Sequence, residues 1–96
     1  MSQEQNQGWE VILQGSFCKS GILFLCMKEA EELNLTGQGY LLSDTMAQVK
    51  LYGNKKQLEE FLNWVKSGKL PKRLLNIQIS YVGEITYEEY NYFEIL

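Results

Sequence analysis

The chain has 96 residues, of which 45% are hydrophobic and 22% charged, and its net charge is −3 at pH 7. This length predicts one domain with one hydrophobic core. The acidic balance argues against a nucleic-acid partner, which normally faces a basic surface. Because there is no histidine and only two cysteines, we expect no cofactor, no transition-metal site and no catalysis by a histidine base.

The two ends of the chain predict a single domain behind a short tail. Residues 1–8 are polar and predict a flexible tail, and residues 9–96 form the domain. The tail lacks the basic start and apolar core of a signal peptide. The longest apolar run, residues 22–27, is too short to span a bilayer. Cys18 and Cys26 fit a reduced protein better than a disulfide scaffold, so we expect a cytoplasmic protein without membrane contact.

The first half of the chain predicts a strand, a helix and a hairpin. Residues 9–17 alternate apolar and polar side chains, as a half-buried strand does. A helical pattern of apolar residues begins at Ile22, after Gly21, and ends near Asn34, a residue type that tolerates left-handed backbone. Two short alternating runs around a turn predict a β-hairpin over residues 38–52.

The second half predicts another helix and two more strands. Asn54 and Gln57 have the spacing of a capping box at the start of a helix. Gly68, followed closely by the single proline of the chain, marks the end of this helix. Residues 74–82 alternate again and predict a strand with Leu75, Ile77, Ile79 and Tyr81 on one face. Residues 91–96 predict a short last strand.

The order of these elements predicts the fold. Strand, helix, hairpin, helix and strand make a βαββαβ chain. We expect an α/β (α+β) ferredoxin-like sandwich, with a four-stranded antiparallel sheet, two helices on one face and a short extra C-terminal strand. Residues 83–90 are acidic and aromatic and predict a loop. The alternative for the tyrosine-rich part, residues 87–92, is a docking edge for a partner.

Two segments carry a resemblance to a known family. GSFCKSGIL, residues 15–23, resembles the strand-to-helix pattern G-x-V-Q-G-V-x-F-R of the acylphosphatase family, and Gly15 matches its first glycine without a gap. NLTGQGYL, residues 34–41, resembles the family's G-L-T-G-W-V-R-N, and Asp44 falls on its turn aspartate. The resemblance covers about residues 9–96 and agrees with the predicted topology.

The resemblance implies a lost chemistry. In the family, loop amides and an arginine hold the phosphate of an acyl phosphate, and an asparagine positions the attacking water. The match places Leu23 at the arginine position and Leu41 at the asparagine position. A leucine gives neither a charge-assisted grip on a dianion nor a hydrogen bond to water. The resemblance therefore implies a domain that no longer hydrolyses acyl phosphates and binds a partner through the former active-site face.

Two sets of candidate residues follow from this match. The candidate anion-binding loop comprises Cys18, Lys19, Ser20, Gly21 and Ile22. The candidate apolar patch comprises Leu23, Phe24 and Leu41. The partner would be a protein or a small anionic ligand that the sequence does not identify.

Three alternatives stay open. One is an active acyl-phosphate hydrolase with relocated groups, such as Lys19 with Gln38 or Ser43. Another is a purely structural role in a larger assembly. In the third, the two leucines repack locally and bind nothing.

Overall fold

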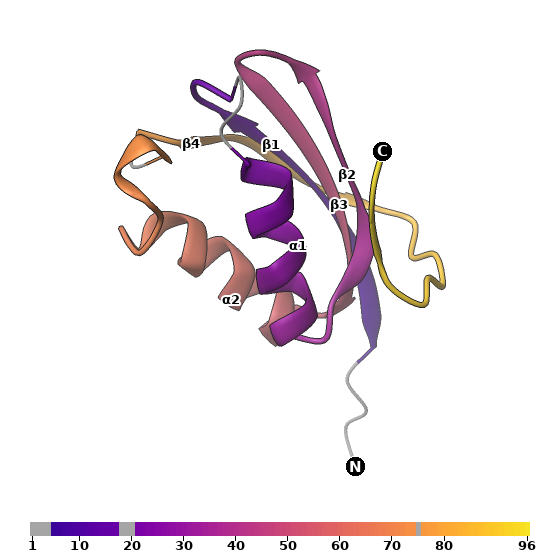
Figure 1. Ribbon diagram of the computed structural model, residues 1–96. Helices are drawn as coiled ribbons and strands as arrows, with labels where there is room; N and C mark the ends of the chain where they lie inside the picture. Colours follow the sequence, from indigo (N-terminus) through magenta and orange to yellow (C-terminus); the bar gives the residue numbers. More distant parts are fainter. Residues whose placement is uncertain (1–4, 18–20, 75) are drawn as a thin grey trace.

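Two helices pack against one face of a twisted β-sheet (Figure 1). The computed structural model describes residues 5–17, 21–74 and 76–96. In chain order the elements are β1 (Asn6–Gln14), α1 (Ile22–Glu32), β2 (Thr36–Ser43), β3 (Met46–Asn54), α2 (Lys55–Lys66), the 3-10 helix η1 (Lys72–Leu74), β4 (Gln78–Ile85) and β5 (Phe93–Ile95).

The sheet has the strand order β4-β1-β3-β2-β5. The first four strands pair antiparallel, and β5 pairs parallel to β2. The predicted ferredoxin-like sandwich is therefore confirmed, with both helices on one face. The short C-terminal strand was also predicted, and its parallel pairing makes the whole sheet five-stranded and mixed.

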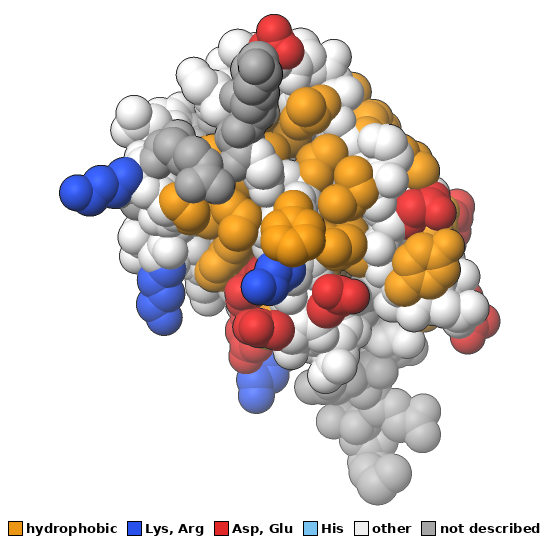
Figure 2. Space-filling model, viewed as in Figure 1, with side chains coloured by type: hydrophobic (Ala, Val, Ile, Leu, Met, Phe, Trp, Pro, Cys, Tyr) orange, Lys and Arg blue, Asp and Glu red, His pale blue; other side chains and the backbone are white. Residues whose placement is uncertain are grey.

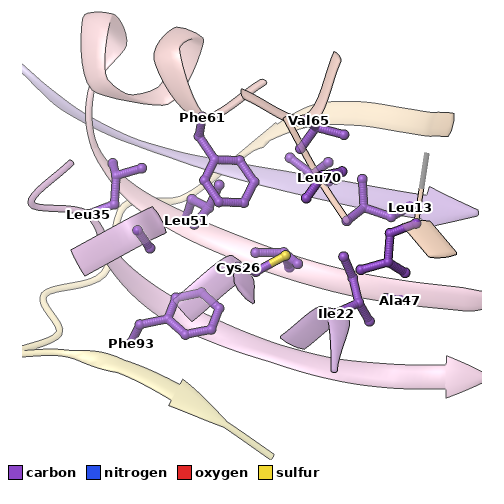
Figure 3. Packing of buried hydrophobic residues seen from close by; sticks show 14 of the residues in the cluster. Leu13, Ile22, Cys26, Leu35, Ala47, Leu51, Phe61, Val65, Leu70 and Phe93 are labelled. Carbon is purple, nitrogen blue, oxygen red and sulfur yellow. The ribbon is translucent and has the colours of Figure 1, made fainter. Parts of the chain in front are cut away.

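The hydrophobic core lies between the helices and the sheet. Alternation along β1 buries Val11 and Leu13 completely, because successive side chains of a strand face opposite sides. Figure 3 shows Cys26 of α1 among side chains from the other elements, including Phe61 of α2 and Phe93 of β5. Burying one large apolar side chain stabilises the fold by about 1.5–3 kcal/mol, so this layer holds both helices to the sheet.

The helix ends follow local signals that were predicted from the sequence. The Gln57 amide N–H donates to Asn54 Oδ1 at 2.9 Å, and the Asn54 amide N–H donates to Gln57 Oε1 at 3.0 Å, which completes the capping box of α2. Asn34 after α1 and Gly68 after α2 have positive φ angles of 60° and 77°. All of these residues take the conformations that their types favour.

The predicted tail over residues 1–8 is too long. Asn6 and Gly8 belong to β1 and pair with Asn54 and Tyr52 of β3. A side chain at Gly8 would lie 2.9 Å from the carbonyl oxygen of Ile85, so the missing side chain lets β1 fit between its neighbours. Polar residues paired on a strand carry no apolar alternation, which is why the sequence pattern missed them.

The face assignment predicted for the fourth strand is also wrong. The alternation placed Ile79 and Tyr81 on one face. In the structure a register shift puts Ile79 opposite Leu13 and Tyr81 opposite Ile12. Adjacent residues of β1 point to opposite faces, so the two β4 side chains do as well.

The bounds of that strand differ from the prediction at both ends. β4 begins at Gln78, because η1 (Lys72–Leu74) occupies the start of the segment predicted as strand. It continues through Ile85, into the segment predicted as loop. The remaining segment, residues 86–92, connects β4 and β5, which lie at opposite edges of the sheet. It crosses the sheet at Tyr52, whose ring contacts those of Tyr87 and Tyr90.

Candidate functional site

A shallow hollow of about 280 Å³ lies beside the start of α1. Its described lining residues come from the end of β1, the first turn of α1, β2 and β5. They are Phe17, Gly21, Ile22, Leu23, Phe24, Leu41 and Ile95. Every one of these side chains is apolar or absent. Figure 2 shows a group of hydrophobic side chains gathered on this face of the molecule. We call these seven residues the apolar hollow.

The first turn of α1 supplies three lining residues of the apolar hollow. Ile22 points into the core and is buried. Leu23 lies over Gly39 of β2, since a Cβ at Gly39 would be 3.2 Å from Leu23 Cδ2. The next residue, Phe24, is 53% exposed, and Lys28 Nζ lies 5.8 Å from the centre of its ring. One helical turn therefore presents an apolar surface with a cation at its rim.

Leu41 reaches the hollow from β2. It shares a face of β2 with Gly39, two residues earlier, because side chains of a strand alternate. That face points toward α1, as the closeness of Gly39 to Leu23 shows. Leu41 is 43% exposed. The structure therefore brings together all three residues of the candidate apolar patch, Leu23, Phe24 and Leu41, in one hollow.

Only part of the candidate anion-binding loop can be placed. Cys18, Lys19 and Ser20 lie outside the described residues. Gly21 has a left-handed backbone with φ 75°, and its carbonyl accepts the Leu25 N–H at 3.1 Å.

Two backbone hydrogen bonds to the β2–β3 turn fix the segment that leads from β1 into this loop. The Phe17 N–H donates to the carbonyl of Asp44 at 2.7 Å, and the Gly15 N–H donates to that of Thr45 at 3.0 Å. The β2–β3 turn thus holds the end of β1, and so sets where the chain enters the loop and α1.

Of the residues named for a relocated hydrolytic site, Lys19 lies outside the described residues, and Gln38 and Ser43 do not line the hollow. Gln38 alternates with Gly39 and so faces the opposite side of the sheet. On that side Tyr40 Oη donates to Gln48 Oε1 at 2.7 Å. Ser43 is exposed at the β2–β3 turn, where its Oγ accepts the Thr45 N–H at 3.2 Å. The sheet therefore separates Gln38 from the apolar hollow.

Two lining residues, Phe17 and Ile95, were not among the candidate site residues of the sequence analysis. Ile95 follows Phe93 on β5 by two residues, and it reaches the hollow only because β5 pairs with β2. The one signal was the apolar alternation of the last residues. It predicts a strand but not its neighbour.

The described residues in and near this site include no reactive thiol and no metal-binding cluster. Burial raises the pKa of Cys26, on the core-facing side of α1, to about 12, so its thiol stays protonated. Among the residues that the structure places, no three histidine, cysteine or carboxylate side chains gather to hold a metal ion. No helix in the described ranges is long and apolar enough to cross a membrane.

The chain belongs to the acylphosphatase family. The family model described as acylphosphatase matches residues 9–95, which include the whole apolar hollow and every helix. No curated protein matches the sequence.

Solved structures show the same fold at low identity. An acylphosphatase from Coxiella burnetii has 24% identity and a TM-score of 0.77, with all of both chains covered. One from Bacillus subtilis has 17% identity and a TM-score of 0.69, over 94% of this chain and 98% of that one. Full-length HypF, in a phosphate- and nucleotide-bound form, has 23% identity and a TM-score of 0.81. That match covers 99% of this chain but only 12% of HypF.

Proposed function

We propose that this acylphosphatase-family domain has lost acyl-phosphate hydrolysis and acts as a binding module through the apolar hollow. One observation carries the proposal. Leu23 and Leu41, which the family pattern matches to its arginine and asparagine, line the same hollow from different elements. Two residues of one former site should meet in space, so this agreement supports the match of the two positions.

The lining chemistry supports loss of hydrolysis. No charged or hydrogen-bonding side chain is among the lining residues that the structure describes. A phosphate dianion without such partners loses hydration and gains no charge-assisted contact. One such contact contributes about 1.5–3 kcal/mol, and one preorganised catalytic donor about 10²–10³ in rate. An apolar group fits this surface better than a phosphate does.

The active-hydrolase alternative has less support. The example that the sequence offers for it pairs Lys19 with Gln38 or Ser43. Gln38 faces the other side of the sheet, and Ser43 lies at the exposed turn, so neither would meet a substrate in the hollow.

The expected cytoplasmic location, drawn from the two cysteines, stays a prediction.

The test is to restore the missing groups. Benzoyl phosphate hydrolysis, followed by absorbance, compares the unmodified chain with a Leu23→Arg, Leu41→Asn double variant. We expect the unmodified chain to remain at the uncatalysed rate. The double variant should exceed it by at least about 10²-fold, because it regains one charged contact and one positioning amide. The arginine stem can still cover the apolar floor that Leu23 covers.

A matched control moves the same changes by one residue. The Phe24→Arg, Leu42→Asn variant carries the same groups on the same two elements, and we expect it to stay inactive. Activity in the unmodified chain would overturn the proposal. Equal activity in both double variants would show that an added arginine suffices and that the two matched positions have no special role.

A further inference from the structure

The last part of the chain is attached to the domain at few points. Residues 86–96 leave β4 at one edge of the sheet, cross the sheet and end in β5 at the other edge (Figure 1). Among these residues, all of which the structure describes, only Phe93 is buried, and most of the others are exposed. We call residues 86–96 the C-terminal strap.

An aromatic cluster holds the crossing part of the strap to the sheet. Tyr52 of β3 lies on the face opposite the helices, and the Tyr90 ring stacks on it with centroids 5.2 Å apart. The Tyr87 ring meets the same Tyr52 ring edge-on at 5.9 Å, and Asn6 Nδ2 donates to Tyr87 Oη at 3.4 Å. Within the described chain, no backbone hydrogen bond joins residues 86–91 to the sheet. The stack on Tyr52 is therefore the main attachment of this part.

The end of the strap is attached along one side only, because β5 is an edge strand beyond β2. The Gly37 N–H donates to the Tyr92 carbonyl at 3.2 Å. The Leu96 N–H donates to the Gly39 carbonyl at 2.8 Å. Phe93 is 3% exposed and packs in the core. One buried ring and a short parallel pairing thus hold β5 in place.

The same strand shapes the apolar hollow. Ile95 of β5 is one of the lining residues. A Cβ at Gly39 would lie 3.0 Å from Phe93 Cζ and 3.2 Å from Leu23 Cδ2, so these two side chains lie over one glycine of β2. Without β5, the hollow would lose Ile95 from its lining, and Leu23 would lose the aromatic ring beside it. The hollow as described therefore requires that β5 is docked on β2.

Segments with few buried side chains and few backbone hydrogen bonds open at a lower free energy than the core, and they open as cooperative units. The C-terminal strap has both properties, whereas β3 is paired with a strand on each side. We propose that the strap docks and releases as one unit, and that its release dismantles the apolar hollow. The stack of Tyr90 on Tyr52 is the latch, on the opposite face of the sheet from the hollow.

This device would control binding at the hollow. A ligand that contacts Ile95 stabilises the docked strap, and by reciprocity a firmly docked strap raises the affinity of the hollow for that ligand. The inference deepens the binding role proposed for the hollow, and it rests on that role only for its use in regulation.

Native-state hydrogen exchange of the whole chain without ligand, followed by NMR, tests the release of the strap. The Gly37 and Leu96 N–H groups are the reporter amides, because their acceptors place them at the two ends of β5. The amides of the central strand β3 report on global unfolding. We expect both reporter amides to exchange at least about 100-fold faster than the slowest β3 amides.

Two substitutions on opposite faces of the sheet should act on this one opening. Tyr90→Ala removes the latch, and Leu23→Ala removes the side chain beside Phe93. Each should speed exchange of both reporter amides by about tenfold. Tyr90→Phe keeps the stacked ring and should leave both rates unchanged. Leu25→Ala is the matched control for Leu23→Ala, because Leu25 also lies on α1 and packs against the core but lines a different hollow. It should leave both rates unchanged.

Three results would overturn the inference. The first is exchange at Gly37 that is as slow as in β3, because the strap would then open only with global unfolding. The second is fast exchange at Leu96 alone, which is fraying of the chain end. The third is an equal effect of Leu23→Ala and Leu25→Ala, with β3 protection showing that both variants stay folded. Hydrolysis of benzoyl phosphate by the unmodified chain would overturn the proposed loss of activity but not the release of the strap.

Discussion

The ring of Tyr90 stacks on the ring of Tyr52, with centroids 5.2 Å apart and planes inclined by 17°. Tyr87 meets the same Tyr52 ring edge-on at 5.9 Å. These contacts lie on the face of the sheet opposite the helices, because Tyr52 alternates with buried Leu51. They leave Tyr52 only 3% exposed. The segment that crosses the sheet to reach β5 is thus held by an aromatic cluster rather than by a strand ladder.

Removing the stacked ring should loosen that segment. We expect Tyr90→Ala to lower the free energy of unfolding by about 1–2 kcal/mol, because an aromatic pair contributes about 0.5–1.5 kcal/mol beyond its burial. Urea denaturation measures the change. Tyr92→Ala is the control, since Tyr92 is 59% exposed, and its effect should stay within about 0.5 kcal/mol. Equal losses in the two variants would contradict a specific role for the stack.

The same cluster predicts a loss of stability at alkaline pH. Burial, and then the nearby Glu88 and Tyr90, raise the pKa of Tyr52 above its ordinary value of 10.0. The unfolded chain therefore releases this proton first, and stability falls as the pH rises above about 10. Below that pH the contribution is fully present. Unfolding followed from pH 8 to about 11.5 should show a smaller alkaline loss in Tyr52→Phe. An identical slope in both chains would count against the buried phenol.

Gly37 and Gly68 should respond differently to the same substitution. Gly37 has φ 146°, and a Cβ there would overlap the carbonyl oxygen of Lys50 on β3. We expect Gly37→Ala to destabilise the fold by at least about 3 kcal/mol, from backbone strain and this overlap. Gly68 has φ 77° with open space around it, so Gly68→Ala should lose only about 1–2 kcal/mol. Similar unfolding midpoints for the two variants would contradict the β2–β3 geometry.

Cys26 should be inert toward thiol reagents in the folded chain. Its pKa of about 12 leaves about one thiolate in 10⁴ at pH 8, and the side chain is fully buried. In a Cys18→Ser chain, where Cys26 is the only thiol, iodoacetamide should react only as fast as the protein unfolds. Adding urea should bring the rate to that of a free cysteine. Fast alkylation without urea would show that α1 opens readily.

The sequence predicted the helix ends, because nearby residues determine them. Asn54 and Gln57 determine the start of α2 through bonds to their own backbone, so their spacing was sufficient to predict the cap. Asn34 and Gly68 likewise end their helices through their own positive φ angles, which their residue types favour. The resemblance matched Leu23 and Leu41 to two positions of one family site, and both residues line the apolar hollow. Their role in that hollow stays a prediction.

The sequence failed where the outcome depends on distant partners. Ile95 lies in the hollow because β5 pairs with β2. The three residues of β5 (Phe93–Ile95) carry no sequence signal that predicts which strand they pair with. The opposite facing of Ile79 and Tyr81 depends on a bulge in the pairing with β1. The early start of β1 depends on Gly8 fitting between Tyr52 and Ile85. None of these contacts leaves a periodic trace in the chain.

The most direct measurement is the turnover of benzoyl phosphate by the unmodified chain, beside the Coxiella burnetii acylphosphatase at equal concentration. If Leu23 and Leu41 have replaced the two groups that the chemistry needs, kcat/KM should be at least about 10⁴-fold lower than that of the control. A value within about tenfold of the control would contradict the account, and would show that the hollow lined by these leucines still supports hydrolysis.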